Sequence, residues 1–243
     1  MEEYDDSTYG QRIAEVYDAF YMDYDPASIE LLAELARGGP ALELGIGTGR
    51  IALPLYEKGV SVQGIDASEA MLSQLRAKPH GAEIEVLTGS FAEFKLEQRF
   101  SLIYVVFNTF FGLLTQEEQV QCFKSVREHL SPEGVFLLEV FVPNLCRFVN
   151  HQTVRAVSVS PSGVKLEVTQ VDPVAQQLTT QHVLLSQNET RLYPVKLRYA
   201  WPTELNLMAQ IAGLDLVQRW GSWSKEAFTK NSQMHISVYK LSE

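Results

Sequence analysis

The sequence has few cysteines and no long apolar run. Two cysteines occur among 243 residues. Cys122 and Cys146 lack the close spacing of a metal site, so we expect two reduced thiols and no bound metal. No stretch of about eighteen consecutive apolar residues is present, which predicts that no segment of the chain spans a membrane.

Basic residues are also scarce relative to acidic ones. Lys and Arg total 20 against 30 Asp and Glu, which gives a formal net charge of −10. This negative charge repels a nucleic-acid backbone, and the sequence has no cluster of Lys and Arg to oppose the repulsion. A nucleic-acid partner is therefore disfavoured, although the alternative of a local basic groove stays open. The first residues are acidic at positions 2, 3, 5 and 6, unlike a secretory signal. We therefore expect a cytoplasmic protein whose partner is a small molecule.

The apolar pattern of the first 140 residues is that of an α/β protein. Hydrophobic residues make up 46% of the chain, enough to bury a substantial core. Helical spacing over residues 9–21 and 26–36 predicts two N-terminal helices. Between residues 41 and 140, five strand-like segments alternate with helical or loop segments. This alternation is typical of a parallel sheet covered by helices on both faces.

Between residues 143 and 199 the spacing of apolar residues changes to the alternation that is typical of strands. The strand-like segments are 154–159, 164–168, 178–185 and 192–197. Turn signals separate them, so an inserted antiparallel sheet is predicted. The chain then returns with a helix over 202–212 and strands over 214–220 and 234–241.

A glycine turn between a buried strand and a helix is the most specific local feature. It spans residues 41–50, ALELGIGTGR, with glycines at positions 45, 47 and 49. Glycines remove the Cβ atoms that keep a ligand off the backbone and allow positive φ in the turn. The helix that follows is expected to begin with Thr48 as its cap. A second strand, over residues 60–66, ends in Asp66, where a carboxylate can accept both hydroxyls of a ribose. Turn and acid together predict a nucleotide-like ligand.

Two residues favour a cationic ligand over a dinucleotide. The fingerprint G-x-G-x-x-G requires glycine at position 50, where the chain has Arg50. Glu43 would repel a pyrophosphate, whereas it would attract an amino group or a sulfonium.

Over residues 1–142 the chain resembles the class I S-adenosylmethionine-dependent methyltransferases. Their first motif, E/D-x-G-x-G-x-G, is matched by Glu43, Gly45, Gly47 and Gly49. Asp66 with Ala67 resembles the second motif, whose acid binds the cofactor ribose. Ser90, followed by Phe91, stands where the family usually has an aspartate that contacts the adenine amino group. A hydroxyl can still accept a hydrogen bond, and the backbone around Phe91 can contribute.

The resemblance implies a Rossmann-like, seven-stranded, mostly parallel sheet with helices on both faces. We expect N-terminal lid helices over 1–37, an S-adenosylmethionine-binding core over 38–142, an antiparallel β insert after strand five over 143–200, and the end of the core sheet over 201–243. The lid and the insert would enclose the methyl acceptor. Because similar inserts in relatives often pair subunits, a homodimer is also expected.

The resemblance also implies a set of site residues. The cofactor-binding residues are Tyr17, Glu43, Gly45, Gly47, Gly49, Arg50, Asp66, Ala67, Ser90, Phe91, Phe107 and Asn108. The candidate catalytic residues are Tyr24 and His182, on the predicted lid and insert. Several alternatives stay open. Arg50 can pair with Glu43, pair with the methionine carboxylate or pack in its helix, a lid tyrosine can pack between helices, and His182 can be structural.

The implied activity is methyl transfer to a small molecule. N-methylation of an amine, on an amino sugar, an amino acid or a natural-product intermediate, is the first hypothesis. C- or O-methylation of an aromatic or indole-type product is the alternative. Orientation of two buried reactants is worth about 7 to 11 kcal/mol in model systems, more than a general base supplies. From other classes, an NAD-dependent oxidoreductase and a catalytically silent S-adenosylmethionine-binding protein are the competing hypotheses.

Overall fold

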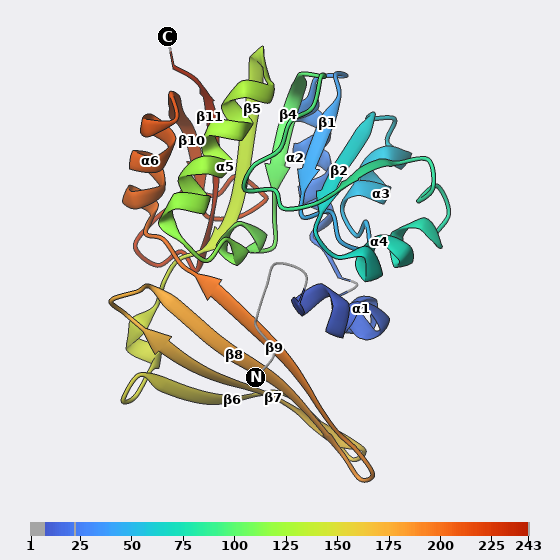
Figure 1. Cartoon of the computed structure of the whole chain (residues 1–243). Coiled ribbons are helices and arrows are strands. Elements are labelled where there is room, and N and C mark those ends of the chain that lie inside the picture. Colours follow the sequence, from blue (N-terminus) through green and yellow to red (C-terminus); the bar gives the residue numbers. More distant parts are fainter. Residues whose placement is uncertain (1–7, 22, 243) are drawn as a thin grey trace.

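The computed structural model describes residues 8–21 and 23–242. Figure 1 shows a sheet covered by helices, a second sheet that projects from it, and the helix α1 (Thr8–Tyr21) between the two. Among the described residues, none of the helices has the length and apolar character needed to cross a bilayer.

The larger sheet has seven strands in the described part of the chain, in the order β10-β11-β5-β4-β1-β2-β3. They are β1 (Ala41–Leu44), β2 (Val62–Asp66), β3 (Glu85–Thr88), β4 (Phe100–Val105), β5 (Leu130–Phe141), β10 (Leu214–Trp220) and β11 (Met234–Leu241). β11 runs antiparallel to both of its neighbours, and the other pairs are parallel. The predicted Rossmann-like fold class is confirmed.

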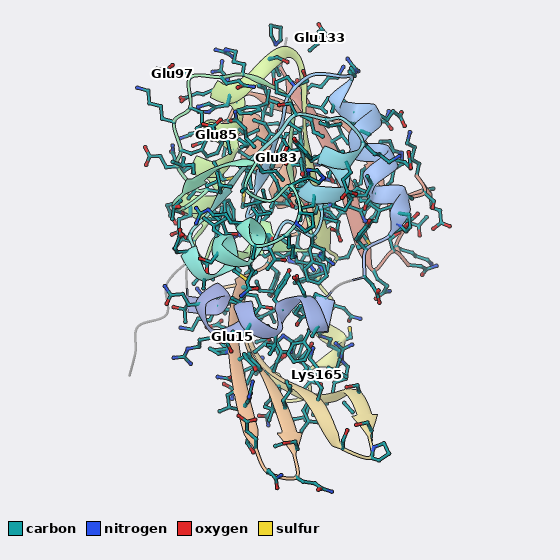
Figure 2. All side chains as sticks on the ribbon, turned by 90° about the vertical axis from the view of Figure 1, so that its right-hand side faces the viewer. Glu15, Glu83, Glu85, Glu97, Glu133 and Lys165 are labelled. Atoms are coloured by element: carbon teal, nitrogen blue, oxygen red, sulfur yellow. The ribbon has the colours of Figure 1, made fainter. Side chains whose placement is uncertain are left out.

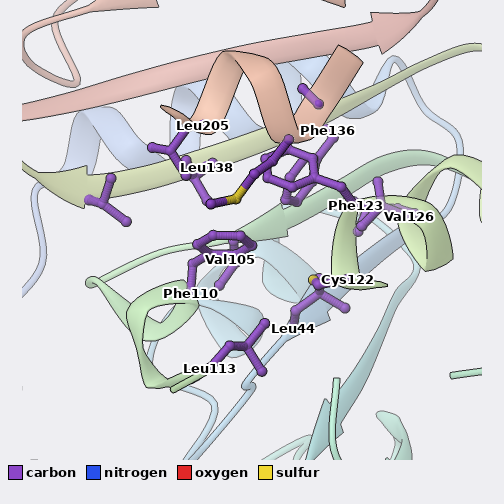
Figure 3. Close-up of a cluster of buried hydrophobic side chains, with 14 of the residues drawn as sticks. Leu44, Val105, Phe110, Leu113, Cys122, Phe123, Val126, Phe136, Leu138 and Leu205 are labelled. Carbon is purple, nitrogen blue, oxygen red and sulfur yellow. The ribbon is translucent and has the colours of Figure 1, made fainter. Parts of the chain in front are cut away.

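Helices cover both faces of this sheet, and each face has its own hydrophobic core. The helices of one face are α2 (Pro26–Ala36), α3 (Ala52–Glu57) and α4 (Glu69–Arg76), and those of the other are α5 (Gln116–His129) and α6 (Pro202–Ile211). Figure 3 shows the core on the side of α5 and α6. In this core Phe123 of α5 packs against Phe136 of β5, with the ring centroids 5.5 Å apart. Because both faces are covered, the central strands β1 and β4 are mostly apolar, and Glu43 in β1 and Ser101 in β4 are the exceptions.

The predicted antiparallel insert follows β5. Its strands are β6 (Gln152–Ser160), β7 (Gly163–Asp172), β8 (Gln177–Ser186) and β9 (Thr190–Arg198), paired in that order. They are longer than predicted because the ladders continue almost to the hairpin turns. Two short 3₁₀ helices, η1 (Thr109–Gly112) and η2 (Leu145–Arg147), follow β4 and β5.

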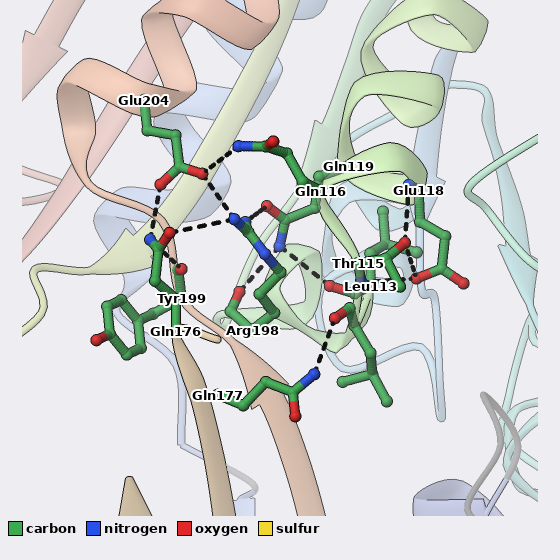
Figure 4. A network of polar contacts seen from close by, with 11 residues as sticks. Leu113, Thr115, Gln116, Glu118, Gln119, Gln176, Gln177, Arg198, Tyr199 and Glu204 are labelled. Atoms are coloured by element: carbon green, nitrogen blue, oxygen red, sulfur yellow. Dashed lines mark hydrogen bonds and ion pairs between the residues drawn. The ribbon is translucent and has the colours of Figure 1, made fainter. Parts of the chain in front are cut away.

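A buried polar network fastens the insert to the core (Figure 4). Arg198, at the end of β9, is 6% exposed and lies 2.7 Å from the carboxylate of Glu204 in α6. It also donates to the side-chain oxygen of Gln119 in α5, at 2.7 Å. The base of the insert is therefore held by charge-assisted hydrogen bonds to two core helices.

Helix α1 contacts both the core and the insert. Asp18 accepts a hydrogen bond from the hydroxyl of Thr48 at 2.6 Å and pairs with Lys78 at 2.6 Å. On the other side, the ammonium of Lys165 in β7 lies 4.1 Å from the centroid of the Phe20 ring (Figure 2). The prediction that Thr48 caps the next helix is wrong, because α3 begins at Ala52 and the Thr48 hydroxyl binds α1 instead.

Candidate functional site

A cavity of about 650 Å³ lies where the core sheet, α1 and the insert meet. Its walls come from the turn after β1, the ends of β2 and β4, helix α1, and the inner face of the insert. Ligands of open α/β sheets bind at the carboxyl ends of the strands, which is where this cavity lies.

The glycine turn and Asp66, the last residue of β2, form one end of the cavity. The backbone N–H of Gly47 donates to Asp66 Oδ2 at 2.8 Å, and Ser68 N–H donates to Oδ1 at 2.8 Å. Burial raises the pKa of Asp66, and these two bonds oppose the shift. Gly45 has a φ of 74°, and a Cβ there would lie 2.3 Å from the methyl of Thr109. Only glycine therefore lets the backbone line the cavity at this point.

Most of the predicted cofactor residues line this cavity. They are Tyr17, Glu43, Gly45, Gly47, Arg50, Asp66, Ala67, Ser90, Phe91, Phe107 and Asn108. Gly49 does not line it. A Cβ at Gly49 would lie 2.4 Å from Leu75 Cδ1, so this glycine allows the turn to pack closely on α4.

Glu43 and Arg50 do not form an ion pair in the described structure. Glu43 is 3% exposed and accepts a hydrogen bond from the hydroxyl of Tyr104 at 3.0 Å. Burial raises the pKa of Glu43 to about 8, although that bond and the nearby Arg50 lower it. Arg50 instead donates to the carbonyls of Tyr21 at 3.2 Å and Asp23 at 2.9 Å. Its role in the structure is thus to hold the end of α1 over the glycine turn.

The tyrosines of the predicted lid differ in their positions. Tyr17 and Tyr21 line the cavity with ring centroids 5.1 Å apart, and Tyr9 lines it too. Burial raises the pKa of Tyr17 to about 12, so its phenol is neutral and acts only through hydrogen bonds and packing. Tyr24 is 38% exposed and is not among the lining residues, so the structure gives its predicted catalytic role no support.

The inner face of the insert brings a carboxylate beside His182, which also lines the cavity. In the strand register, Glu167 of β7 lies opposite both His182 of β8 and Arg155 of β6. Arg155 binds the Glu167 carboxylate at 3.0 Å, and the Glu167 side chain is 15% exposed. Burial lowers the pKa of His182, so the imidazole is neutral near pH 7.

The sequence patterns did not identify Glu167 and Arg155 as site residues. A pattern that points to Glu167 is present, because Lys165 and Glu167 alternate with Val164, Leu166 and Val168 along one strand. Alternation places the charged residues on one face of the sheet. Which face of the insert sheet lines the cavity is decided only by the way the insert docks on the core.

Comparisons with known proteins agree with this geometry. A family model described as "Methyltransferase domain" matches residues 41–134. The structure of the CcbJ methyltransferase from Streptomyces caelestis is 41% identical, covers 99% of this chain and 100% of its own, and superposes with a TM-score of 0.92. The cypemycin N-terminal methyltransferase of a Streptomyces species is 29% identical over 242 residues, covering 96% of this chain and 98% of that protein. The dTDP-3-amino-3,4,6-trideoxy-alpha-D-glucopyranose N,N-dimethyltransferase of Streptomyces venezuelae is 30% identical over 135 residues, which cover 52% of this chain and 56% of that protein.

Proposed function

Because the chain belongs to the class I S-adenosylmethionine-dependent methyltransferases, we propose that it methylates the nitrogen of an amine on a small molecule. Membership sets aside the NAD-dependent oxidoreductase hypothesis. Two of the relatives are by name an N-terminal methyltransferase and an amino-sugar N,N-dimethyltransferase, which supports nitrogen as the acceptor atom.

The residues at the core end of the cavity fit the cofactor. Gly45 and Gly47 have no Cβ atoms to keep a ligand off the backbone, and Asp66 offers a carboxylate for the ribose hydroxyls. Glu43 supplies an acidic group for a ligand that carries an amino group and a sulfonium. When bound, this cofactor supplies a methyl carbon that is open to attack by a nucleophile. In our proposal Tyr17 and Phe107 enclose it, and they exclude water from that end of the cavity.

One observation carries the choice of an amine. Glu167 and His182 lie side by side where the insert lines the cavity, and we assign this end to the acceptor. Arg155 pairs with one oxygen of the Glu167 carboxylate. The other oxygen can attract the ammonium form in which an aliphatic amine arrives at neutral pH. The amine must lose a proton before its nitrogen can attack, and a neutral imidazole can accept that proton. The main contribution of the protein is nevertheless orientation, since the cavity holds both reactants between α1 and the insert.

The first prediction concerns His182. Replacing His182 with alanine is expected to slow methyl transfer by about 10²-fold, the lower range for a lost general base, and to leave cofactor affinity unchanged. The test measures transfer of labelled methyl groups from S-adenosylmethionine to a panel of amines, phenols and indoles, with calorimetry of cofactor binding alongside. Tyr24→Phe is the matched control and should keep the wild-type rate.

The outcomes of that screen separate the hypotheses. Labelling of amines supports the proposal, whereas labelling confined to phenols or to carbon positions of indoles contradicts it. Cofactor binding without transfer to any acceptor would indicate the silent S-adenosylmethionine-binding protein. Wild-type turnover in His182→Ala would return this residue to a structural role.

The second prediction is a pH dependence that depends on Glu43. Because burial raises the pKa of Glu43 to about 8, the free protein holds this carboxyl protonated at neutral pH. A cation bound nearby favours the carboxylate, so binding releases a proton and affinity rises with pH up to about 8. Calorimetry of S-adenosylmethionine binding between about pH 6 and 8 should show this rise, up to a limit of about tenfold per pH unit. Glu43→Gln should flatten the profile, and an unchanged profile in that variant would contradict the assignment.

We further propose that the outer face of the insert pairs with a second copy of the chain. This face lies opposite Glu167 and His182 and exposes apolar side chains, among them Val154 (67% exposed) and Leu192 (53% exposed). Large exposed apolar patches mark interaction sites. Sedimentation equilibrium should show a dimer for the wild type and for Leu207→Glu, an exposed control on α6, and a monomer for Leu192→Glu. A monomeric wild type would contradict this.

A further inference from the structure

Two consecutive residues after β4 adopt a backbone conformation that side chains disfavour. Phe107 has a φ of 58° and Asn108 a φ of 64°. Asparagine visits this left-handed region more readily than most residues, but a bulky phenylalanine does not. Such a conformation persists only where the surroundings hold it in place, and it is concentrated at functional sites.

The neighbouring strand β5 holds these two residues. The side-chain carboxylate of Glu139 accepts a hydrogen bond from the backbone N–H of Phe107 at 2.6 Å. The backbone carbonyl of Glu139 accepts one from the N–H of Asn108 at 3.3 Å. Asn108 Oδ1 in turn accepts a bond from Phe141 N–H at 2.6 Å. Burial raises the pKa of Glu139, and the Phe107 bond opposes this shift. The side chain of Glu139 is thus placed to fix the backbone of Phe107.

The ring of Phe107 is the point at which three elements meet over the cavity. The guanidinium of Arg50 lies 4.1 Å from its centroid, and the ring of Tyr21 packs against it edge-on at 5.4 Å. Arg50 also binds the carbonyls at the end of α1. The positions of the glycine turn, the β4 loop and the lid helix relative to one another therefore depend on where this ring lies.

We propose that Glu139 is a positioning residue for the cofactor end of the cavity. By holding Phe107 in its left-handed conformation, Glu139 fixes the position of the Phe107 ring. Arg50 and Tyr21 pack against this ring and so hold α1 over the cofactor. Glu139 is not among the residues that line the cavity, so it acts through Phe107. The proposal depends on cofactor binding by this family and not on the identity of the acceptor.

The test uses S-adenosylhomocysteine as the probe, measured by calorimetry on the full chain, with thermal unfolding alongside. Glu139→Ala is expected to weaken binding about tenfold, because the lid no longer closes on a fixed ring. Glu139→Gln keeps a side-chain oxygen that can accept the Phe107 bond, so it should retain near-wild-type affinity. Glu118→Ala is the matched control, because the Glu118 carboxylate also accepts a backbone N–H, that of Thr115 at 2.9 Å, but lies outside the cavity. It should lower the melting temperature and leave affinity unchanged.

A double-mutant cycle with Phe107→Ala decides whether Glu139 acts through that ring. Phe107→Ala alone should weaken binding, and adding Glu139→Ala should then have no further effect on affinity. The proposal is overturned if the two losses multiply, if the glutamine variant binds as weakly as the alanine variant, or if Glu139→Ala changes only the melting temperature.

Discussion

Replacing Asp66 with alanine is expected to weaken binding of S-adenosylhomocysteine by about 100-fold or more. Hydrogen bonds to charged groups are worth about 1.5 to 3 kcal/mol each, and in our proposal this carboxylate accepts bonds from two ribose hydroxyls. It also accepts the N–H of Gly47, so its loss frees the turn that lines the same end of the cavity. Calorimetry measures the affinity, and circular dichroism checks that the variant is folded.

Two variants sharpen this test. Asp66→Asn keeps one acceptor oxygen without the charge and should bind with intermediate affinity. Glu85→Ala removes an exposed carboxylate from the neighbouring strand β3 and should bind like the wild type. If Asp66→Ala bound with unchanged affinity, the ribose would lie elsewhere and the assignment of the whole cofactor end would be wrong.

Replacing Arg198 with methionine is expected to lower the free energy of unfolding by about 3 kcal/mol, because breaking a buried ion pair leaves an unpaired buried charge. The side chains of Arg198 and Glu204 are 7% and 17% exposed, so water compensates Glu204 only in part. The amide of Gln119 loses a partner as well. Urea denaturation followed by fluorescence measures the change.

Removing both charges provides the control. Replacing both Arg198 and Glu204 with methionine leaves no unpaired charge and should recover part of the lost stability. Arg191→Met breaks the pair with Glu189, whose side chains are 47% and 55% exposed, and should have little effect. An Arg198→Met variant as stable as the wild type would show that this network does not hold the insert to the core.

The elements that could be predicted from the sequence depend on local patterns. The helix predicted over residues 26–36 has those bounds in the structure, with Pro26 as its first residue and Asp25 as its cap. The glycine turn and Asp66 come together because β1 and β2 are adjacent parallel strands whose carboxyl ends share one edge. Gly49, by contrast, matches the family motif but packs on α4 away from the cavity.

The sequence alone determined the fold class, the ligand type and the strand that carries each motif residue, since hydrophobic period and turn chemistry are encoded over short distances along the chain. Only the tertiary structure decided that Arg50 holds α1, that Glu167 joins His182 in the cavity, and that Glu139 holds Phe107. Arg50 and Glu139 contact backbone groups that lie 27 to 32 residues away along the chain. Glu167 and His182 pair on adjacent strands, but the face of the insert that carries them reaches the cavity only through the way the insert docks on the core. No local pattern records that docking.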